Sequence, residues 1–323
     1  MKVLIIGGAG MIGQKLAQRL AKDGHLGGKP IDSLVLSDVV EARCRDWPFP
    51  MVAKVGDLSQ PGHAEELVAD RPDVIFHLAA IVSGEAEQEF DKGYRVNVDG
   101  TRALFEAVRK AGHKPRLVFT SSIAVFGAPF PEVIGDEFFT TPLTSYGTQK
   151  AIGELLLADY TRKGFFDGIG IRLPTICVRP GKPNKAASGF FSNIIREPLA
   201  GEEAVLPVSE DVRHWHASPR AAVGFLLHAA TIDGAAVGPR RNLTMPGVSV
   251  TVAEQIEALR KVAGDKVVAR IRREPDPTIM QIVAGWPRNF DASRAISLGF
   301  KADSSFEEII RIHIEDELGG KIA

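Results

Sequence analysis

The residues with the clearest chemical potential are a tyrosine and a lysine, Tyr146 and Lys150, which lie four positions apart. Because an α-helix brings residues i and i+4 to one face, this spacing predicts that the two side chains are neighbours. An ammonium group beside a phenol stabilises the phenolate and lowers its pKa from the ordinary value of about 10. Tyr146 could then take a proton from a hydroxyl group near neutral pH. The other two tyrosines, Tyr94 and Tyr160, have no lysine at this spacing.

A serine at the end of an apolar run adds a third candidate. Ser122 follows the β-branched and aromatic residues of 116–121, which predict a strand. At the carboxyl end of a parallel strand, where ligands of such folds bind, its hydroxyl could hold the reacting oxygen. A Tyr-x-x-x-Lys pair by itself fits an exposed pair on a helix equally well. The order of a glycine-rich loop, a serine, Tyr146 and Lys150 along one chain favours the catalytic interpretation.

The glycine-rich loop lies at the start of the chain, where residues 2–13 have the sequence KVLIIGGAGMIG. An apolar strand leads into the glycines, and a helical pattern follows them. Glycine permits a tight turn and lets the backbone approach a pyrophosphate, while the N–H groups at a helix N-terminus favour negative charge. A tight turn without a ligand is the alternative interpretation. The predicted cofactor contacts of this turn are Gly7, Gly10, Met11, Ile12 and Gly13.

An acidic residue, Asp38, ends the second apolar run of the chain. Its carboxylate could accept hydrogen bonds from an adenosine ribose and would repel a 2′-phosphate, which favours NAD over NADP. Arg43 and Arg45 lie close by in the sequence and leave room for some use of NADP. In the alternative interpretation, Asp38 only caps the turn that follows it.

Two further dipeptides follow predicted strands. Asp57 and Leu58 come after the third strand, where they could meet the adenine edge, and Ala79 and Ala80 come after the fourth. The small side chains of the two alanines would let the cofactor lie against the backbone. Taken singly, each of these residues is more typical of a structural role than of a functional one.

The elements that must position these residues form an α/β pattern of alternating short apolar runs and helical segments. The predicted strands are 2–6, 33–37, 51–55, 73–77, 116–121 and 168–173, and the predicted helices include 12–21, 98–111 and 146–163. This alternation is typical of a Rossmann-type doubly wound parallel sheet. We predict an NAD-binding Rossmann domain over 1–175, with a return of the chain around 210–250, and a smaller C-terminal substrate-binding domain over 176–323.

The second part of the chain is more irregular. Residues 174–189 are rich in Pro, Gly and Asn, which predicts a loop at the mouth of a site. Helical patterns follow at 190–199, 219–231, 252–263 and 305–316. His214 and His216 would share one face of a strand, but no third ligand is evident, so no metal site is predicted and their role stays open.

Composition and charge limit the classes of function. The 323 residues are 45% hydrophobic and 24% charged, and 39 Lys and Arg nearly balance 40 Asp and Glu, as in an ordinary globular protein. This balance gives no reason to expect a nucleic acid or a membrane as partner. The two cysteines are too few for a disulfide framework or a zinc site. Two ordinary thiols fit a reducing cytoplasm best. Since no apolar run approaches the roughly 20 residues that span a bilayer, we also predict that the protein is soluble.

Together these motifs resemble the extended short-chain dehydrogenases, a family that includes nucleotide-sugar epimerases and dehydratases. The resemblance covers nearly the whole chain and is carried by Gly7-x-x-Gly10-x-x-Gly13, Asp57-Leu58, His77-Leu78-Ala79-Ala80, Asn97-Val98-Asp99-Gly100-Thr101, Ser121-Ser122 and Tyr146-x-x-x-Lys150. It implies that Tyr146 is the acid/base, that Lys150 lowers its pKa and binds the nicotinamide ribose, and that Ser122 orients the substrate. Asn97, which it places with the cofactor site, would help to fix the architecture. A homodimer is usual in this family, and the helix that starts at Tyr146 is a candidate contact.

Two departures from the family bear on the substrate. After the sixth strand, the epimerases have an Arg-aromatic-Phe-Asn stretch whose Asn binds the nucleotide diphosphate, whereas this chain reads Arg172-Leu173-Pro174-Thr175. Where those enzymes have Arg-Asp-aromatic, this chain keeps Arg213 but not its neighbours. Both departures favour a smaller anion held by a guanidinium group, for which a carboxylate is the obvious candidate.

Residues 179–199 resemble the corresponding segment of D-erythronate dehydrogenases, which use NAD to oxidise the C2 hydroxyl of a four-carbon sugar acid to 2-oxo-tetronate. This resemblance implies an oxidoreductase in which Tyr146 removes the hydroxyl proton while hydride leaves C2 for the nicotinamide. The predicted substrate contacts are Ser83, Ser122, Tyr146, Arg179, Asn184 and Arg213. Surface roles for Lys182 and Arg196 are as plausible as roles in the pocket.

Two other functions stay open. A nucleotide-sugar epimerase or dehydratase would share the first oxidation but keep its NAD tightly bound and recycle it in each turnover. A non-catalytic NAD(P)-binding regulator would lack the tyrosine or the lysine, and both Tyr146 and Lys150 are present.

Overall fold

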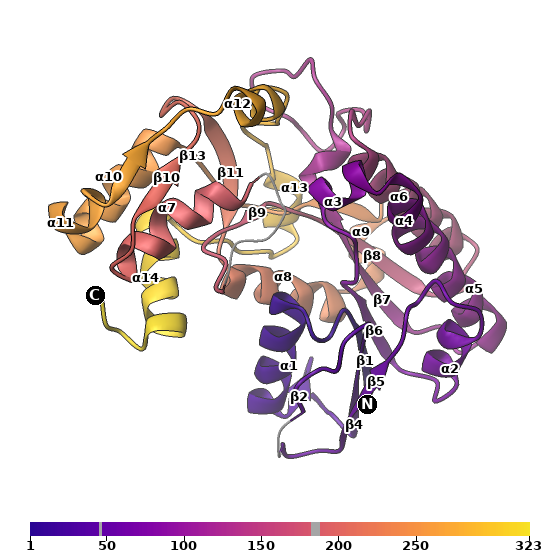
Figure 1. Cartoon of the computed structure of the whole chain (residues 1–323). Coiled ribbons are helices and arrows are strands. Elements are labelled where there is room, and N and C mark those ends of the chain that lie inside the picture. The colour runs from indigo at the N-terminus through magenta and orange to yellow at the C-terminus, as the bar shows by residue number, and fades with distance from the viewer. Residues whose placement is uncertain (45–46, 182–187) are drawn as a thin grey trace.

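The computed structural model describes residues 1–44, 47–181 and 188–323, and its centre is a sheet of seven parallel strands (Figure 1). The strand order is β12-β8-β7-β6-β1-β4-β5, which confirms the predicted doubly wound sheet. The strands are β1 (Lys2–Ile6), β4 (Ser33–Asp38), β5 (Met51–Val55), β6 (Val74–His77), β7 (Arg116–Ser122), β8 (Asp167–Leu173) and β12 (Asn242–Thr244). The first six of these agree with the six predicted strands to within one residue at either end.

The sheet is covered on both faces, which explains why its strands are continuous apolar runs. All four residues of β6 are buried, and in β1 only Lys2 is exposed. Helices α1 (Met11–Asp23) and α8 (Pro219–Thr231) cover one face, and α2 (His63–Val68), α5 (Thr101–Ala111) and α6 (Ser145–Arg162) cover the other (Figure 1). A parallel sheet buried on both faces needs apolar side chains at successive positions rather than at alternate ones.

The helical segment observed around the predicted helix 98–111 is longer and less regular than the prediction. The chain runs through α4 (Phe90–Tyr94) and a π-helical segment, η1 (Arg95–Gly100), before α5 begins. Such π-helical segments are rare and occur often at functional sites. This segment contains Asn97, whose buried side chain forms hydrogen bonds with the Ile81 backbone and the Gln149 side chain.

The C-terminal part has a core of its own, built around α7 (Gly189–Leu199), α10 (Val252–Ala263) and α14 (Phe306–Leu318). Two small sheets support it, with strand orders β13-β11-β9 and β10-β14. Their strands are β9 (Thr175–Ile176), β10 (Ala204–Leu206), β11 (Arg213–Ala217), β13 (Val248–Thr251) and β14 (Ile271–Arg273). Between these elements the chain returns to the large sheet, where α8 packs and β12 pairs with β8.

The expectation of a loop over 174–189 is wrong for its first residues, because β9 lies there and pairs in parallel with β11. That pairing joins segments some 40 residues apart, which no local pattern records. The remaining elements are short: β2 (His25–Leu26), β3 (Lys29–Pro30), α3 (Ser83–Gln88), η2 (Ile123–Val125), α9 (Gly234–Val237), α11 (Asp265–Val268), α12 (Pro277–Ala284) and α13 (Ser293–Ser297).

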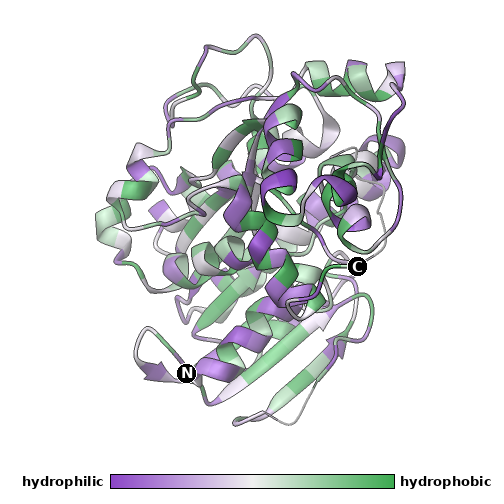
Figure 2. Ribbon diagram, turned by 90° about the vertical axis from the view of Figure 1, so that its left-hand side faces the viewer, coloured by the Kyte–Doolittle hydropathy of each residue, from purple (hydrophilic) through white to green (hydrophobic). Residues whose placement is uncertain are grey.

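The hydropathy of the residues agrees with their positions in the layers of the fold (Figure 2). The strands of the large sheet are mostly hydrophobic, whereas the helices that cover them alternate between hydrophobic and hydrophilic residues. Such amphipathic helices place one face on the sheet and the other in solvent. In the part of the chain that the structure describes, no helix is both long and apolar enough to cross a membrane.

Candidate active site

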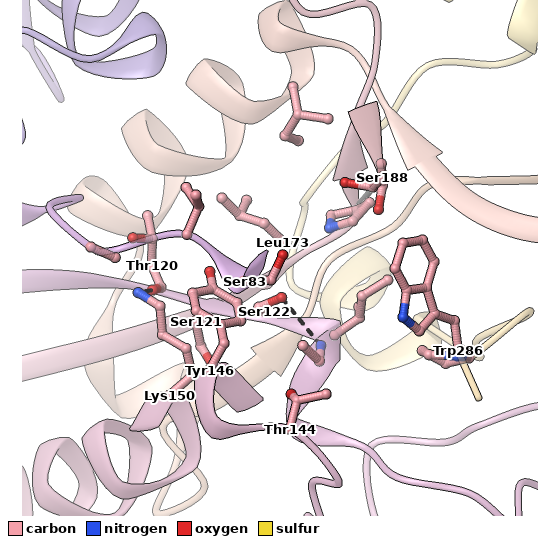
Figure 3. Close-up of a pocket in the computed structure, with 18 of the residues that line it drawn as sticks. Ser83, Thr120, Ser121, Ser122, Thr144, Tyr146, Lys150, Leu173, Ser188 and Trp286 are labelled. Carbon is pink, nitrogen blue, oxygen red and sulfur yellow. Dashed lines mark hydrogen bonds between the residues drawn. The ribbon is translucent and has the colours of Figure 1, made fainter. Parts of the chain in front are cut away.

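A pocket of about 370 Å³ lies where β7 and β8 end, and it gathers residues from both parts of the chain. Ligands of open α/β sheets bind at this carboxyl edge. Of the residues predicted from the sequence, eight line it: Met11, Ile12, Ala80, Ser83, Ser122, Tyr146, Lys150 and Arg179. The C-terminal part contributes the opposite wall, which includes Ser188 and Trp286 (Figure 3).

The catalytic candidates lie together in this pocket. Tyr146 and Lys150 come from the first turns of α6, and the lysine Nζ is 5.7 Å from the centroid of the tyrosine ring. Ser122 ends β7 and lies beside Tyr146, with Ser83 nearby on α3 (Figure 3). The Lys150 ammonium donates a hydrogen bond to the Thr120 carbonyl oxygen at 2.7 Å, which fixes its position.

Burial dominates the electrostatics of the pair. It raises the pKa of Tyr146, against the opposing effects of the Ser122 hydroxyl and the Arg179 charge. Burial also lowers the pKa of Lys150 to about 7, while the Glu154 carboxylate acts in the opposite direction. The lowered tyrosine pKa expected from the sequence is therefore not found, because desolvation of the phenolate outweighs the Ser122 hydrogen bond and the Arg179 charge.

A buried ion pair between Glu154 and Arg172, which was not predicted from the sequence, lies behind Lys150. Glu154, one helical turn beyond the lysine, accepts hydrogen bonds from Arg172 Nε at 2.9 Å and Nη2 at 2.7 Å. It also accepts one from the Ser121 hydroxyl at 2.6 Å. Both charged side chains are at most 8% exposed. The spacing of Lys150 and Glu154 was a usable signal, but the arginine partner lies in β8 and could be found only from the fold.

Three of the four glycines of the first loop, Gly7, Gly10 and Gly13, belong to the predicted motif, and their need for glycine differs. Gly7 has a φ of +90°, and a Cβ there would lie 2.7 Å from the Ala79 nitrogen. A Cβ on Gly13 would lie 2.2 Å from the Gly7 carbonyl oxygen. A Cβ on Gly10 would approach that oxygen only to 3.4 Å, which is an ordinary contact. The protein's own packing thus requires Gly7 and Gly13 but not Gly10.

The acidic residues predicted near the cofactor support the backbone. Asp38 accepts hydrogen bonds from the Ala9 nitrogen at 2.9 Å and the Val39 nitrogen at 2.7 Å, so it ties the glycine-rich loop to the end of β4. Asp57 accepts bonds from the nitrogen and hydroxyl of Ser59. Leu58 is buried in the core. The turn-capping alternative therefore describes part of what Asp38 does.

Asn97 and Ala79 are not among the described residues that line the pocket. The Asn97 side chain accepts a hydrogen bond from the Ile81 nitrogen at 2.8 Å and donates to the Ile81 oxygen at 3.1 Å. It also donates to Gln149 at 2.7 Å. These bonds join the segment after β6, at Ile81, to Gln149 in α6. Asn97 therefore holds this segment and the helix together.

Of the two arginines predicted to contact the substrate, only Arg179 is among the described residues that line the pocket. Arg179 lines the pocket, and its guanidinium donates to the Ile176 oxygen at 3.0 Å and the Ser188 hydroxyl at 2.9 Å. Arg213 is instead turned toward Ser249 and Glu254, and it is not among the described residues that line the pocket. Neighbouring residues of a strand point to opposite faces, and in β11 it is His214 that faces the pocket. Asn184 and Arg45 lie outside the described residues.

His214, Thr175 and Trp286 line the pocket without having been predicted as contacts. The His214 ring stacks on Phe191 with an angle of 2° between the planes. Its Nδ1 is 3.0 Å from the Pro287 oxygen, and its Nε2 is 2.7 Å from the Thr175 hydroxyl. The spacing of His214 and His216 does place both on one face, but in the described residues no group of three metal-binding side chains comes together.

Comparison with known proteins gives this pocket a family context. Residues 3–235 match the model of the NAD dependent epimerase/dehydratase family. The D-erythronate dehydrogenase of Cupriavidus necator is 50% identical over 98% of both chains, and that of Haemophilus influenzae is 46% identical over 98% of this chain and 100% of its own.

A crystal structure from Agrobacterium tumefaciens, described as a nucleoside-diphosphate-sugar epimerase, is 68% identical. It matches with a TM-score of 0.98 over 100% of this chain and 96% of that one. The curated relatives confirm the predicted enzyme class, a dehydrogenase that acts on a CH–OH group with a nicotinamide cofactor. The chain belongs to the NAD-dependent epimerase/dehydratase family.

Proposed function

We propose that the protein oxidises the C2 hydroxyl of D-erythronate to 2-oxo-tetronate, with NAD as the hydride acceptor. The observation that carries this proposal is the identity of 50% and 46%, over nearly the whole chain, to two curated D-erythronate dehydrogenases. The local chemistry agrees with it, because the pocket combines the Tyr146 and Lys150 pair with the partly buried guanidinium of Arg179.

The loop before α1 fits a dinucleotide. No side chain in the described part of the chain caps the N-terminus of α1, so its first N–H groups are left for another acceptor. Gly10, which the protein's own packing does not require, is where a pyrophosphate would approach the backbone. The Asp38 carboxylate at the end of β4 favours the free ribose of NAD over the 2′-phosphate of NADP.

In the proposed mechanism the side chains divide the work. Ser122 and Tyr146 hold the C2 hydroxyl, and Tyr146 takes its proton as general base. Lys150, fixed by Thr120, would bind the nicotinamide ribose and add positive charge beside the phenol. A bound oxidised cofactor would supply the hydride acceptor for C2 and a further positive charge. Arg179 would hold the substrate carboxylate, which leaves C2 directed at Tyr146.

The glycine loop provides a direct test of cofactor binding. Gly10→Ala should weaken NAD binding by about tenfold or more, because its methyl group occupies the approach of the pyrophosphate. The φ of −67° at Gly10 suits alanine, so the variant should be as stable as the parent or slightly more stable. Gly13→Ala is the matched contrast, since its Cβ would strike the Gly7 oxygen and destabilise the fold. Calorimetric titration with NAD and urea unfolding separate the two outcomes.

A nucleotide-sugar epimerase is the second candidate, and the description of the 68% identical Agrobacterium structure favours it. Thr175 argues against it, because it occupies the position at which the resembled epimerases have a nucleotide-binding asparagine. Both activities begin with the same oxidation. They differ in whether NADH leaves the enzyme.

The deciding assay follows NADH absorbance with NAD and either D-erythronate, other four- to six-carbon sugar acids, UDP-glucose or UDP-galactose. We expect steady NADH formation from D-erythronate and none from the UDP-sugars. Conversion of a UDP-sugar without net NADH would establish the epimerase instead, and binding of NAD without any turnover would favour the regulator. The homodimer stays a prediction, which chromatography with light scattering tests. The substrate-binding role of residues 176–323 also stays a prediction.

A further inference from the structure

The hydrogen bonds around His214 determine which of its ring nitrogens carries the proton. Nδ1 faces the backbone oxygen of Pro287 at 3.0 Å, and a carbonyl oxygen can only accept, so we assign a proton to Nδ1. Burial lowers the pKa of His214 to about 4, and the nearby Arg179 charge adds to this effect although the Pro287 bond opposes it. The ring is therefore neutral at physiological pH, and Nε2 carries only a lone pair.

This assignment fixes the direction of the next hydrogen bond. Thr175 Oγ1 lies 2.7 Å from Nε2, and because Nε2 can only accept, the threonine hydroxyl must donate to it. Its single proton is then committed to the histidine. The ring cannot easily turn away, since it is stacked on Phe191 and packed against Trp286. In the pocket that it lines, Thr175 thus presents lone pairs and no proton.

An acceptor of this kind selects among the groups of a polyhydroxy acid. A carboxylate oxygen has lone pairs only, so it would be repelled by Thr175 and would bind at Arg179 instead. The C2 hydroxyl gives its proton to Tyr146 in the proposed reaction and is not free to donate elsewhere. The group that matches Thr175 is a hydroxyl that does not react.

We propose that Thr175 accepts a hydrogen bond from the C3 or C4 hydroxyl of the substrate, an inference that rests on the proposed function. His214 is then the positioning residue, because it fixes the direction in which the Thr175 hydroxyl donates its proton. Thr175 would then be a specificity-determining residue, one that distinguishes sugar acids from 2-hydroxy acids lacking a further hydroxyl. The asparagine of the resembled epimerases is replaced here by a group suited to a smaller, hydroxylated ligand.

The test pairs protein variants with substrate analogues. D-erythronate is compared with 2,4-dihydroxybutanoate and 2,3-dihydroxybutanoate, which lack the C3 and the C4 hydroxyl respectively. Thr175→Val should lower kcat/KM for D-erythronate by about tenfold to a hundredfold, because it removes the acceptor and leaves a buried hydroxyl unpaired. For the analogue that lacks the partner hydroxyl, the same variant should change kcat/KM by less than about threefold. Thr175→Ser, which keeps the hydroxyl, should restore the preference for D-erythronate.

An equal loss for all three acids in Thr175→Val, or a serine variant that behaves like the valine variant, would overturn the proposal. The proton assignment has a test that needs no turnover, namely ¹⁵N NMR of histidine-labelled protein with His214→Gln to identify the signal. A proton on Nε2 at neutral pH would reject the inference even if D-erythronate is a substrate. If the wild-type protein oxidises no sugar acid, the proposed function and the substrate role of Thr175 fail together, while the NMR result still decides whether Thr175 is an acceptor.

Discussion

Tyr146→Phe should lower kcat for D-erythronate oxidation by about 10²- to 10⁴-fold, the range that a positioned general base contributes. The phenol oxygen is the only atom removed, and the ring keeps its place in the pocket wall. Folding and NAD binding should therefore be preserved. Tyr160→Phe is the matched control, because Tyr160 lies near the other end of α6 and its hydroxyl bonds Glu106 instead of facing the pocket. Steady-state NADH formation measures both variants.

The pH profile strengthens this test. Oxidation needs the deprotonated form of Tyr146, and burial raises the pKa of that residue. The activity of the wild-type protein should therefore be low in acid and rise as the pH increases toward the alkaline range. Any residual activity of Tyr146→Phe should lack this ascent. A variant that kept more than about a tenth of the wild-type kcat, with the same ascent, would show that another group is the base.

The large sheet could be predicted because its strands are buried on both faces. A run such as 74–77, in which every side chain must be apolar or paired, is conspicuous in the sequence and begins directly after the charged Asp73. The short strands β9 and β13 carry no such signal. They exist because β11 lies between them, and β11 is placed by the fold of the whole C-terminal part.

In the site, too, residues marked by local sequence patterns could be predicted, whereas residues placed by the fold could not. Tyr146, Lys150 and Ser122 were predictable because helix spacing and a strand end record their positions. Arg213 was predicted to contact the substrate from its charge and from the family position that it keeps, although in β11 it is His214 that faces the pocket. The alternation of side chains along a strand decides this, and the pattern of only five residues gave no indication of which face was inward.

Glu154→Gln should cost about 3–5 kcal/mol of unfolding free energy, a large share of the stability of a typical domain. The amide keeps the size of the side chain but leaves the Arg172 guanidinium buried and uncompensated. Because the Glu154 carboxylate favours the protonated form of Lys150, its loss should lower the pKa of that lysine still further. Asp159→Asn on the same helix is the control, since its pair with Arg162 is exposed and should be worth less than about 1 kcal/mol.

Urea unfolding distinguishes an unpaired charge from a simple loss of packing. If the cost of Glu154→Gln comes from the stranded guanidinium, then replacing both partners, as in Glu154→Leu with Arg172→Met, should recover much of the lost stability. Purely additive losses in the double variant would mean that the two side chains stabilise the protein independently. Recovery of stability without recovery of kcat would separate the two consequences of this ion pair. An apolar pair can replace it in the core, whereas loss of the Glu154 carboxylate still lowers the pKa of Lys150.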